Sequence, residues 1–235
     1  MSKNKNSAFQ MIADVEGDLE DILNVEVPDN VPILPVRNLV LFPGVVSPIL
    51  IGRDSSKIVI QKAEKRGDFI GIVCQRDPEV DVPLQEDLYR TGVFAKVMKL
   101  LTLPNGNITA IVQCHNRFQL NRLTQTSPYL EGDVEQHIDL DPDKRDREFK
   151  AAMEDLRSLV NEYINVSEDI PDEATFAIKN ISNNIMALNF VCSNMPFPIK
   201  RISDAENTGI ENTDYIARIG LCKNLTVIGH YLLGL

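Results

Sequence analysis

The sequence predicts an α+β fold, with a β-rich lobe followed by an α-helical lobe. Apolar and polar residues alternate with the period of a strand on both sides of Asn105-Gly106, and Asn-Gly is the strongest short-range hairpin signal. After Asp141-Pro142 the apolar residues recur instead with the period of a helix. This change of period divides the chain into two parts of different structural class.

Short strands are predicted through most of the first part, bounded by glycine, proline and asparagine. One helix interrupts them over residues 55–66, because Ile58, Val59 and Ala63 have helical spacing and Gly67 ends the pattern. The predicted strands cover residues 33–36, 45–50, 69–74, 92–103, 108–114, 118–123 and 130–135.

Two amphipathic helices are predicted in the second part. The first has one apolar face from Phe149 to Ile164. The second starts at Pro171, carries a stripe that ends at Cys192, and is stopped by Pro196-Phe197-Pro198. Together these helices form a helical hairpin. The predicted organisation is an acidic, mobile leader (1–30), a β-rich lobe (31–138), a helical lobe (139–198) and a tail without a predicted state (199–235).

Composition limits the function classes. The net charge is −10, which disfavours a general nucleic-acid binder because phosphate contacts supply most of that affinity. The four cysteines include no C-x-x-C pair and are predicted to be free and buried. No signal peptide and no run of about 20 apolar residues occurs, so the chain is predicted to be cytoplasmic with no membrane contact.

No catalytic, metal or cofactor site is predicted. The phosphate-loop, dinucleotide, zinc-protease and serine-hydrolase motifs are absent. The histidines are far apart: His115 is predicted to lie at a surface or strand end, and His137 to be solvated. The acids at 139–143 lack the spacing of a calcium loop and are predicted to start a helix. Elimination favours a non-catalytic binding or assembly module.

Three ordered motifs carry a family resemblance. They are Val31-Pro-Ile-Leu-Pro-Val-Arg37 with Leu41-Phe-Pro-Gly44 and Pro48-Ile49, then Gly92-Val-Phe-Ala95, and then Leu103-Pro-Asn-Gly106 with Arg117-Phe118. In this order they resemble the N-terminal domain of the Lon proteases, over about residues 31–195. Cys114 departs from the family pattern, which has glycine there.

The resemblance implies a six-stranded, PUA-like pseudo-barrel and a helical lobe. It implies recognition of unfolded or damaged substrate proteins in protein quality control, and contacts with other subunits of a hexameric ATP-dependent protease. ATP and Mg would bind only in the ATPase region, whose motifs do not follow Pro198. The chain is therefore expected to be an excised fragment, a truncated product or a free-standing domain.

Candidate site residues follow from these motifs. Arg37, Phe42 and Pro43 are candidate substrate contacts, although a core anchor is the favoured interpretation of Phe42 and an ion pair with an acid of the neighbouring strand that of Arg37. The residues assigned to the structural motif are Pro35, Gly44, Pro48, Gly92, Asn105, Gly106 and Arg117. Three alternatives stay open: a stand-alone module for RNA or a small ligand, a truncated fragment acting as an adaptor, and a hydrolase, for which no nucleophile and base are evident.

Overall fold

The computed structural model describes residues 11–12, 25–104, 107–137, 147–166, 181 and 183–194. The strands are β1 (Met11–Ile12), β2 (Asn30–Val36), β3 (Val45–Ile51), β4 (Ile70–Gln75), β5 (Leu88–Thr102), β6 (Ile108–Gln125) and β7 (Leu130–His137). The helices are α2 (Asp54–Arg66), the short 3-10 helix η1 (Gln85–Asp87), α3 (Arg147–Val166) and α5 (Asn184–Asn194). Six longer strands and a few helices confirm the mostly β character of the first part.

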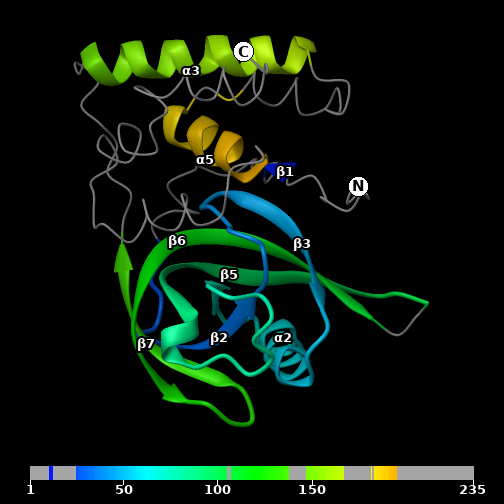
Figure 1. Ribbon diagram of the computed structural model, residues 1–235. Helices are drawn as coiled ribbons and strands as arrows, with labels where there is room; N and C mark the ends of the chain where they lie inside the picture. Colours follow the sequence, from blue (N-terminus) through cyan, green and yellow to red (C-terminus); the bar gives the residue numbers. More distant parts are fainter. Residues whose placement is uncertain are drawn as a thin grey trace.

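The sheet closes on itself through β6 (Figure 1). One edge of β6 pairs with β5, whereas its other edge pairs first with β3 at residues 108–113 and then with β7 at residues 117–125. From β5 the order continues through β4 and β2 back to β7. The predicted strands 108–114 and 118–123 are therefore one strand, because residues 115–117 stay extended where β6 changes partner.

Strands β2 and β4 are parallel neighbours, and the chain between them passes first through β3 and then through helix α2. Its buried side Val59, Ile60 and Ala63 packs into a core cluster shared with β3 and β6. Gly67 follows the last turn with φ +69°, and its N–H donates to the Ala63 carbonyl at 2.8 Å. The predicted helix and its glycine stop are confirmed.

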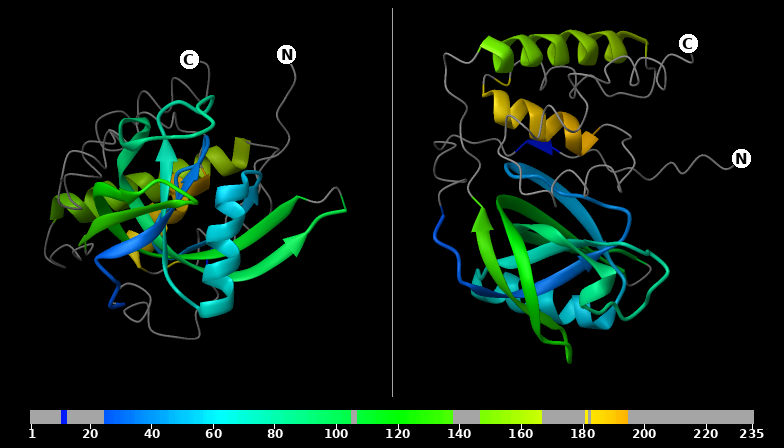
Figure 2. Two further views of the ribbon diagram at one scale, coloured as in Figure 1. Left: turned by 90° about the horizontal axis from the view of Figure 1, so that it is seen from below. Right: turned by 60° about the vertical axis from the view of Figure 1, so that its left-hand side comes forward.

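Helix α5 lies between the β-rich unit and α3 (Figures 1 and 2). The predicted first helix is confirmed as α3, with Met153, Leu156 and Val160 buried. The predicted second helix is wrong at its start among the described residues, because Ile181 and Asn183 are not helical. The Asn183 side chain accepts a hydrogen bond from the Met186 N–H at 3.0 Å, so it caps the N-terminus of α5.

The leader contacts the sheet where it is described. Met11–Ile12 pair with β3, and Val25 and Val27 pack against a core cluster. The predicted 92–103/108–114 hairpin is confirmed as β5–β6, with the Leu103 N–H donating to the Asn107 carbonyl at 2.8 Å. Asn105-Gly106 and the predicted tail 199–235 lie outside the described residues.

Candidate functional site

Strands β3, β6 and β5 form a three-stranded part of the sheet, which we call the extension. The β5–β6 hairpin at its end projects from the β-rich unit (Figure 1). Alternate residues of these strands share one face. The register places six side chains on the outward side, in one row of Leu50, Thr109 and Leu101 and a second row of Pro48, Ile111 and Lys99. We call these six residues the hairpin face.

The hairpin face is apolar and open to solvent. Leu50 is 63% exposed and Leu101 is 40% exposed, whereas Ile49 and Ala110 on the other side of the same strands are buried. The extension is thus apolar on both sides, and among the described residues only the inner side has a core packed on it. Grouped exposed apolar side chains of this kind mark interaction surfaces.

The strands beneath the hairpin face are basic. No aspartate or glutamate occurs between Asp87 and Glu131. The same stretch contains the basic residues Arg90, Lys96, Lys99, Arg117 and Arg122. Of these residues only Lys99 belongs to the hairpin face, since Arg117 is buried beside α5 and Arg122 pairs with Asp133.

The Phe42-Pro43-Gly44 turn lies inside the fold, below α5. Phe42 is fully buried, and Pro43 and Gly44 are also buried. Gly44 has φ +78°, and its N–H donates to the Cys114 carbonyl at 3.0 Å, at the point where β6 changes partner. The burial of Phe42 agrees with its interpretation as a core anchor. Because Phe42 and Pro43 are both buried, a substrate would reach them only if the segments around them moved.

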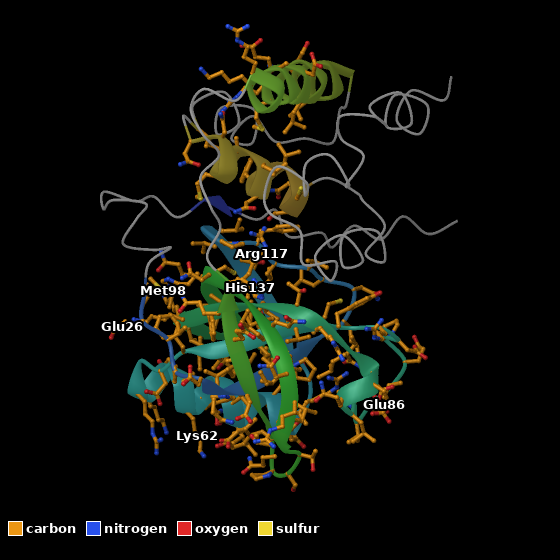
Figure 3. All side chains as sticks on the ribbon, turned by 90° about the vertical axis from the view of Figure 1, so that its left-hand side faces the viewer. Glu26, Lys62, Glu86, Met98, Arg117 and His137 are labelled. Carbon is orange, nitrogen blue, oxygen red and sulfur yellow. The ribbon has the colours of Figure 1, made fainter. Side chains whose placement is uncertain are left out.

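A buried polar contact joins this turn to α5. The Asn189 side chain of α5 accepts a hydrogen bond from the Arg117 guanidinium at 2.9 Å and donates one to the Pro43 carbonyl at 3.2 Å. The same guanidinium lies 5.6 Å from the centre of the Phe42 ring. Figure 3 shows Arg117 at the end of the β-rich unit that is nearest α5. Arg117 therefore links β6 to the helical region.

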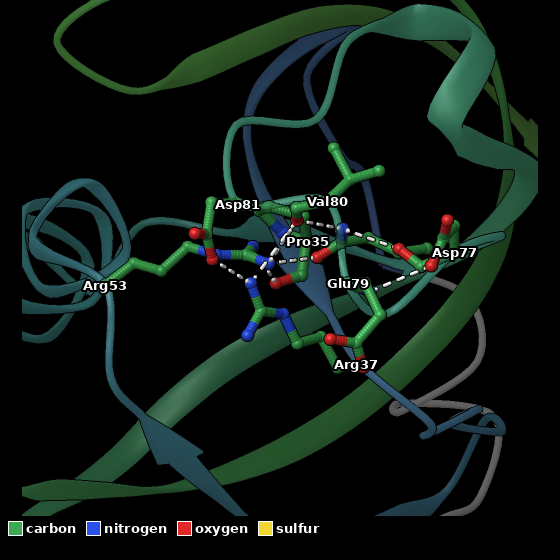
Figure 4. A network of polar contacts seen from close by, with 8 residues as sticks. Pro35, Arg37, Arg53, Asp77, Glu79, Val80 and Asp81 are labelled. Carbon is green, nitrogen blue, oxygen red and sulfur yellow. Dashed lines mark hydrogen bonds and ion pairs between the residues drawn. The ribbon is translucent and has the colours of Figure 1, made fainter.

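Arg37 lies in a different network, at the surface (Figure 4). Its guanidinium donates to the Asp81 carboxylate at 2.6 Å and to the Val80 carbonyl at 3.3 Å. Asp81 belongs to the loop between β4 and β5, so the expected acid partner exists but is not on a neighbouring strand. The structure thus places Arg37 apart from Phe42 and Pro43.

A second arginine, Arg53, completes this network. Arg53 donates to the Pro35 and Val80 carbonyls and to the Gln75 side chain. These hydrogen bonds hold the β4–β5 loop against the end of β2 and the start of α2. Burial, and then the neighbouring positive charge of Arg37, lower the pKa of Arg53. These contacts have the character of a loop anchor.

Nothing in the described part of the chain has the arrangement of a metal site: no three His, Cys, Asp or Glu side chains come together as ligands there. None of the helices in those residues combines the length and apolarity needed to span a bilayer. The expectation for His115 was wrong, because it is buried within β6 and its ring meets the Phe69 ring edge-on at 5.1 Å. Burial also raises the pKa of the neighbouring Cys114 thiol.

Comparison with known proteins identifies the family. A model of the ATP-dependent protease La (LON) substrate-binding domain matches residues 30–203. The chain belongs to this Lon family. It is 42% identical over 183 residues to a Lon protease of Parabacteroides distasonis and 40% identical over 183 residues to one of Flavobacterium johnsoniae. Each match covers 78% of this chain and 22% of the relative, so the chain spans about a fifth of the length of these Lon proteases.

A solved Lon structure has the same fold. The N-terminal domain of the Lon protease of the Mycobacterium avium complex matches with a TM-score of 0.65 at 18% sequence identity. The match covers 81% of this chain and 96% of that domain. At this identity the likeness concerns the fold.

The Lon motif residues have structural positions that the fold explains. A Cβ on Gly92 would lie 2.5 Å from the Phe118 ring and 2.7 Å from the Ile72 carbonyl oxygen, so β4 and β5 need a glycine there. Pro35 lies in β2 beside Val73 of β4, and Pro48 lies in β3 opposite Ile111.

Sequence reasoning missed two features of this Lon domain. The sequence signal for the hairpin face is in Val45–Ile51, where apolar residues occupy both faces of a strand. This pattern is typical of a strand that packs against other groups on both of its faces. Asn189 left a signal as a single amide within the apolar run Ile185–Cys192.

Proposed function

We propose that this chain recognises unfolded or damaged protein substrates for a Lon-type ATP-dependent protease, as a part that does not itself cut them. Its membership of a family described as substrate-binding supports this role. So does the hairpin face, which is the observation that carries the proposal. Unfolded proteins expose apolar segments that folded proteins bury, and an open apolar surface can hold such segments reversibly.

The remaining partners follow from the family. We propose other Lon subunits as the second class of partner, in a hexamer that this region helps to hold together, and the cytoplasm as the site of action. ATP and Mg would bind in another region of the full-length protease. For the architecture, we propose a PUA-like barrel with a separate helical lobe.

Binding of a fluorescently labelled, intrinsically unfolded casein to the full chain tests the proposal. We expect Leu50→Ser and Leu101→Ser each to weaken binding about fivefold or more, since each removes the contact of a large apolar side chain. Val82→Ser is the matched control, because Val82 is an apolar side chain that is 77% exposed on the β4–β5 loop, outside the hairpin face.

Equal loss in all three variants, or no loss in any, would place recognition elsewhere on the chain. Casein that shows no binding even at high chain concentration would contradict the substrate role itself. The RNA-binding alternative predicts salt-dependent affinity for RNA, and the net charge of −10 disfavours it.

A further inference from the structure

Lys99 gives the hairpin face a charge as well as an apolar surface. It lies in the row of Pro48 and Ile111, one row from Leu50 and Leu101. The two rows are two residues apart along each strand, which is about 7 Å, so a single bound segment can touch both rows.

The Lys99 ammonium lacks an anionic partner in the described part of the chain. Its side chain is exposed and makes no hydrogen bond or ion pair with a residue that the structure describes. The sequence accounts for this, because β3 and the whole of β5 and β6 contain no acidic residue. A partner that brings a carboxylate would supply the missing charge.

The edges of the extension favour docking onto its face over addition of a strand. Among the described strands, residues 47–51 of β3 and 96–102 of β5 pair only with β6. Pro48 has no N–H to offer along the β3 edge. The β5 edge is interrupted by a bulge between Val97 and Lys99. A segment on the face contacts side chains, and side-chain contacts discriminate between sequences.

We infer that the hairpin face selects apolar segments that carry an acidic side chain, with Lys99 as the residue that sets this preference. The inference rests on the proposed function, because it assigns a preference to the same surface. Leu50, Leu101 and Ile111 contact the apolar part of the segment, and the Lys99 ammonium pairs with its carboxylate. An exposed pair of this kind changes affinity by about two- to fivefold.

Three leucine-rich peptides of one length, with Glu, Gln or Lys at a single central position, test this preference by fluorescence anisotropy on the full chain. We expect the Glu peptide to bind tightest and the Lys peptide weakest, with a smaller difference at high salt. Lys99→Glu should reverse the order. The control Lys65→Glu makes the same change of charge at an exposed position of α2, which packs on the other side of the sheet. It should leave the order unchanged.

The outcomes separate the inference from the proposed function. An order that Lys99→Glu leaves unchanged, or that Lys65→Glu also reverses, overturns the inference. If the three peptides bind equally and all lose affinity in Leu50→Ser, the substrate role stands and the acidic preference is wrong. If no peptide binds the unaltered chain, the proposed function fails together with the inference.

Discussion

At the scale of single residues, Gly44 shows why the Phe-Pro-Gly turn needs its glycine. Its φ of +78° is a left-handed conformation that costs other residues about 1–2 kcal/mol. A Cβ there would also lie 2.4 Å from the end of the Met186 side chain of α5. We expect Gly44→Ala to lower the free energy of unfolding by about 1–3 kcal/mol, measured by urea denaturation.

Gly67→Ala is the matched control for this prediction. Gly67 has a similar φ of +69°, but a Cβ there would meet no atom within 4 Å. It should show the backbone cost alone. If the contact with α5 adds to the cost at Gly44, then Gly44→Ala should cost less in a Met186→Ala background than in the unaltered chain. Equal costs in both backgrounds would contradict a contribution from Met186.

At the scale of elements, Asn189 fixes how α5 docks. Its amide is buried, and it bridges the Arg117 guanidinium and the Pro43 carbonyl. Asn189→Ala removes both hydrogen bonds, and a loss of this kind costs about 1–3 kcal/mol when a polar partner stays buried. We expect faster amide hydrogen exchange in residues 184–194, with exchange in β4, β5 and β6 unchanged.

Ser193→Ala is the control on the same helix, because the Ser193 hydroxyl donates to the Asn189 backbone carbonyl at 2.7 Å, so its hydrogen bond stays within α5. If amide hydrogen exchange in residues 184–194 rises equally in both variants, the stability of the helix determines the exchange and the docking of α5 does not. Unchanged exchange in Asn189→Ala would mean that apolar contacts alone hold α5 in place.

Elements with strong local signals were predictable from the sequence, and their partners were not. Gly67 predicted the end of α2 and Asn-Gly predicted the β5–β6 hairpin, because both are signals within a few residues of sequence. The continuity of β6 through residues 115–117 depends on pairing with distant β3 and β7. The local alternation of apolar and polar residues contains no information on this change of partner strand, so β6 was predicted as two strands.

At the scale of the whole molecule, the same reason limits prediction of the candidate site. The motif residues Phe42, Gly44 and Arg117 were found from the sequence, and the fold brings them together below α5. The hairpin face was not found, because a shift of one residue in register would turn Leu50 and Leu101 inward. Only the three-strand register settles which apolar side chains are left outside.

Polar side-chain contacts join β2, β6 and β7 at the seam where the sheet closes. The Asp133 carboxylate of β7 accepts hydrogen bonds from Asn30 of β2 at 2.9 Å and from Arg122 of β6 at 2.6 Å. The hydrogen bond from Asn30, followed by that from Arg122, lowers the pKa of Asp133 below its ordinary value. A lowered pKa means that the ionised form of this carboxylate is more stable in the folded state than in the unfolded state.

The sign of the pH dependence follows from this shift. The stabilisation is fully present above the unfolded pKa of about 3.9 and is lost as the pH falls below that value through the lower folded pKa. We expect Asp133→Asn to reduce the urea midpoint at pH 7, and the difference from the unaltered chain to shrink below about pH 4. Glu135→Gln, at an exposed position two residues further along β7, is the control and should leave the midpoint nearly unchanged at both pH values. A difference for Asp133→Asn that stays constant down to pH 3 would contradict a role for the ionised carboxylate, and the seam would then depend on side-chain shape and backbone pairing.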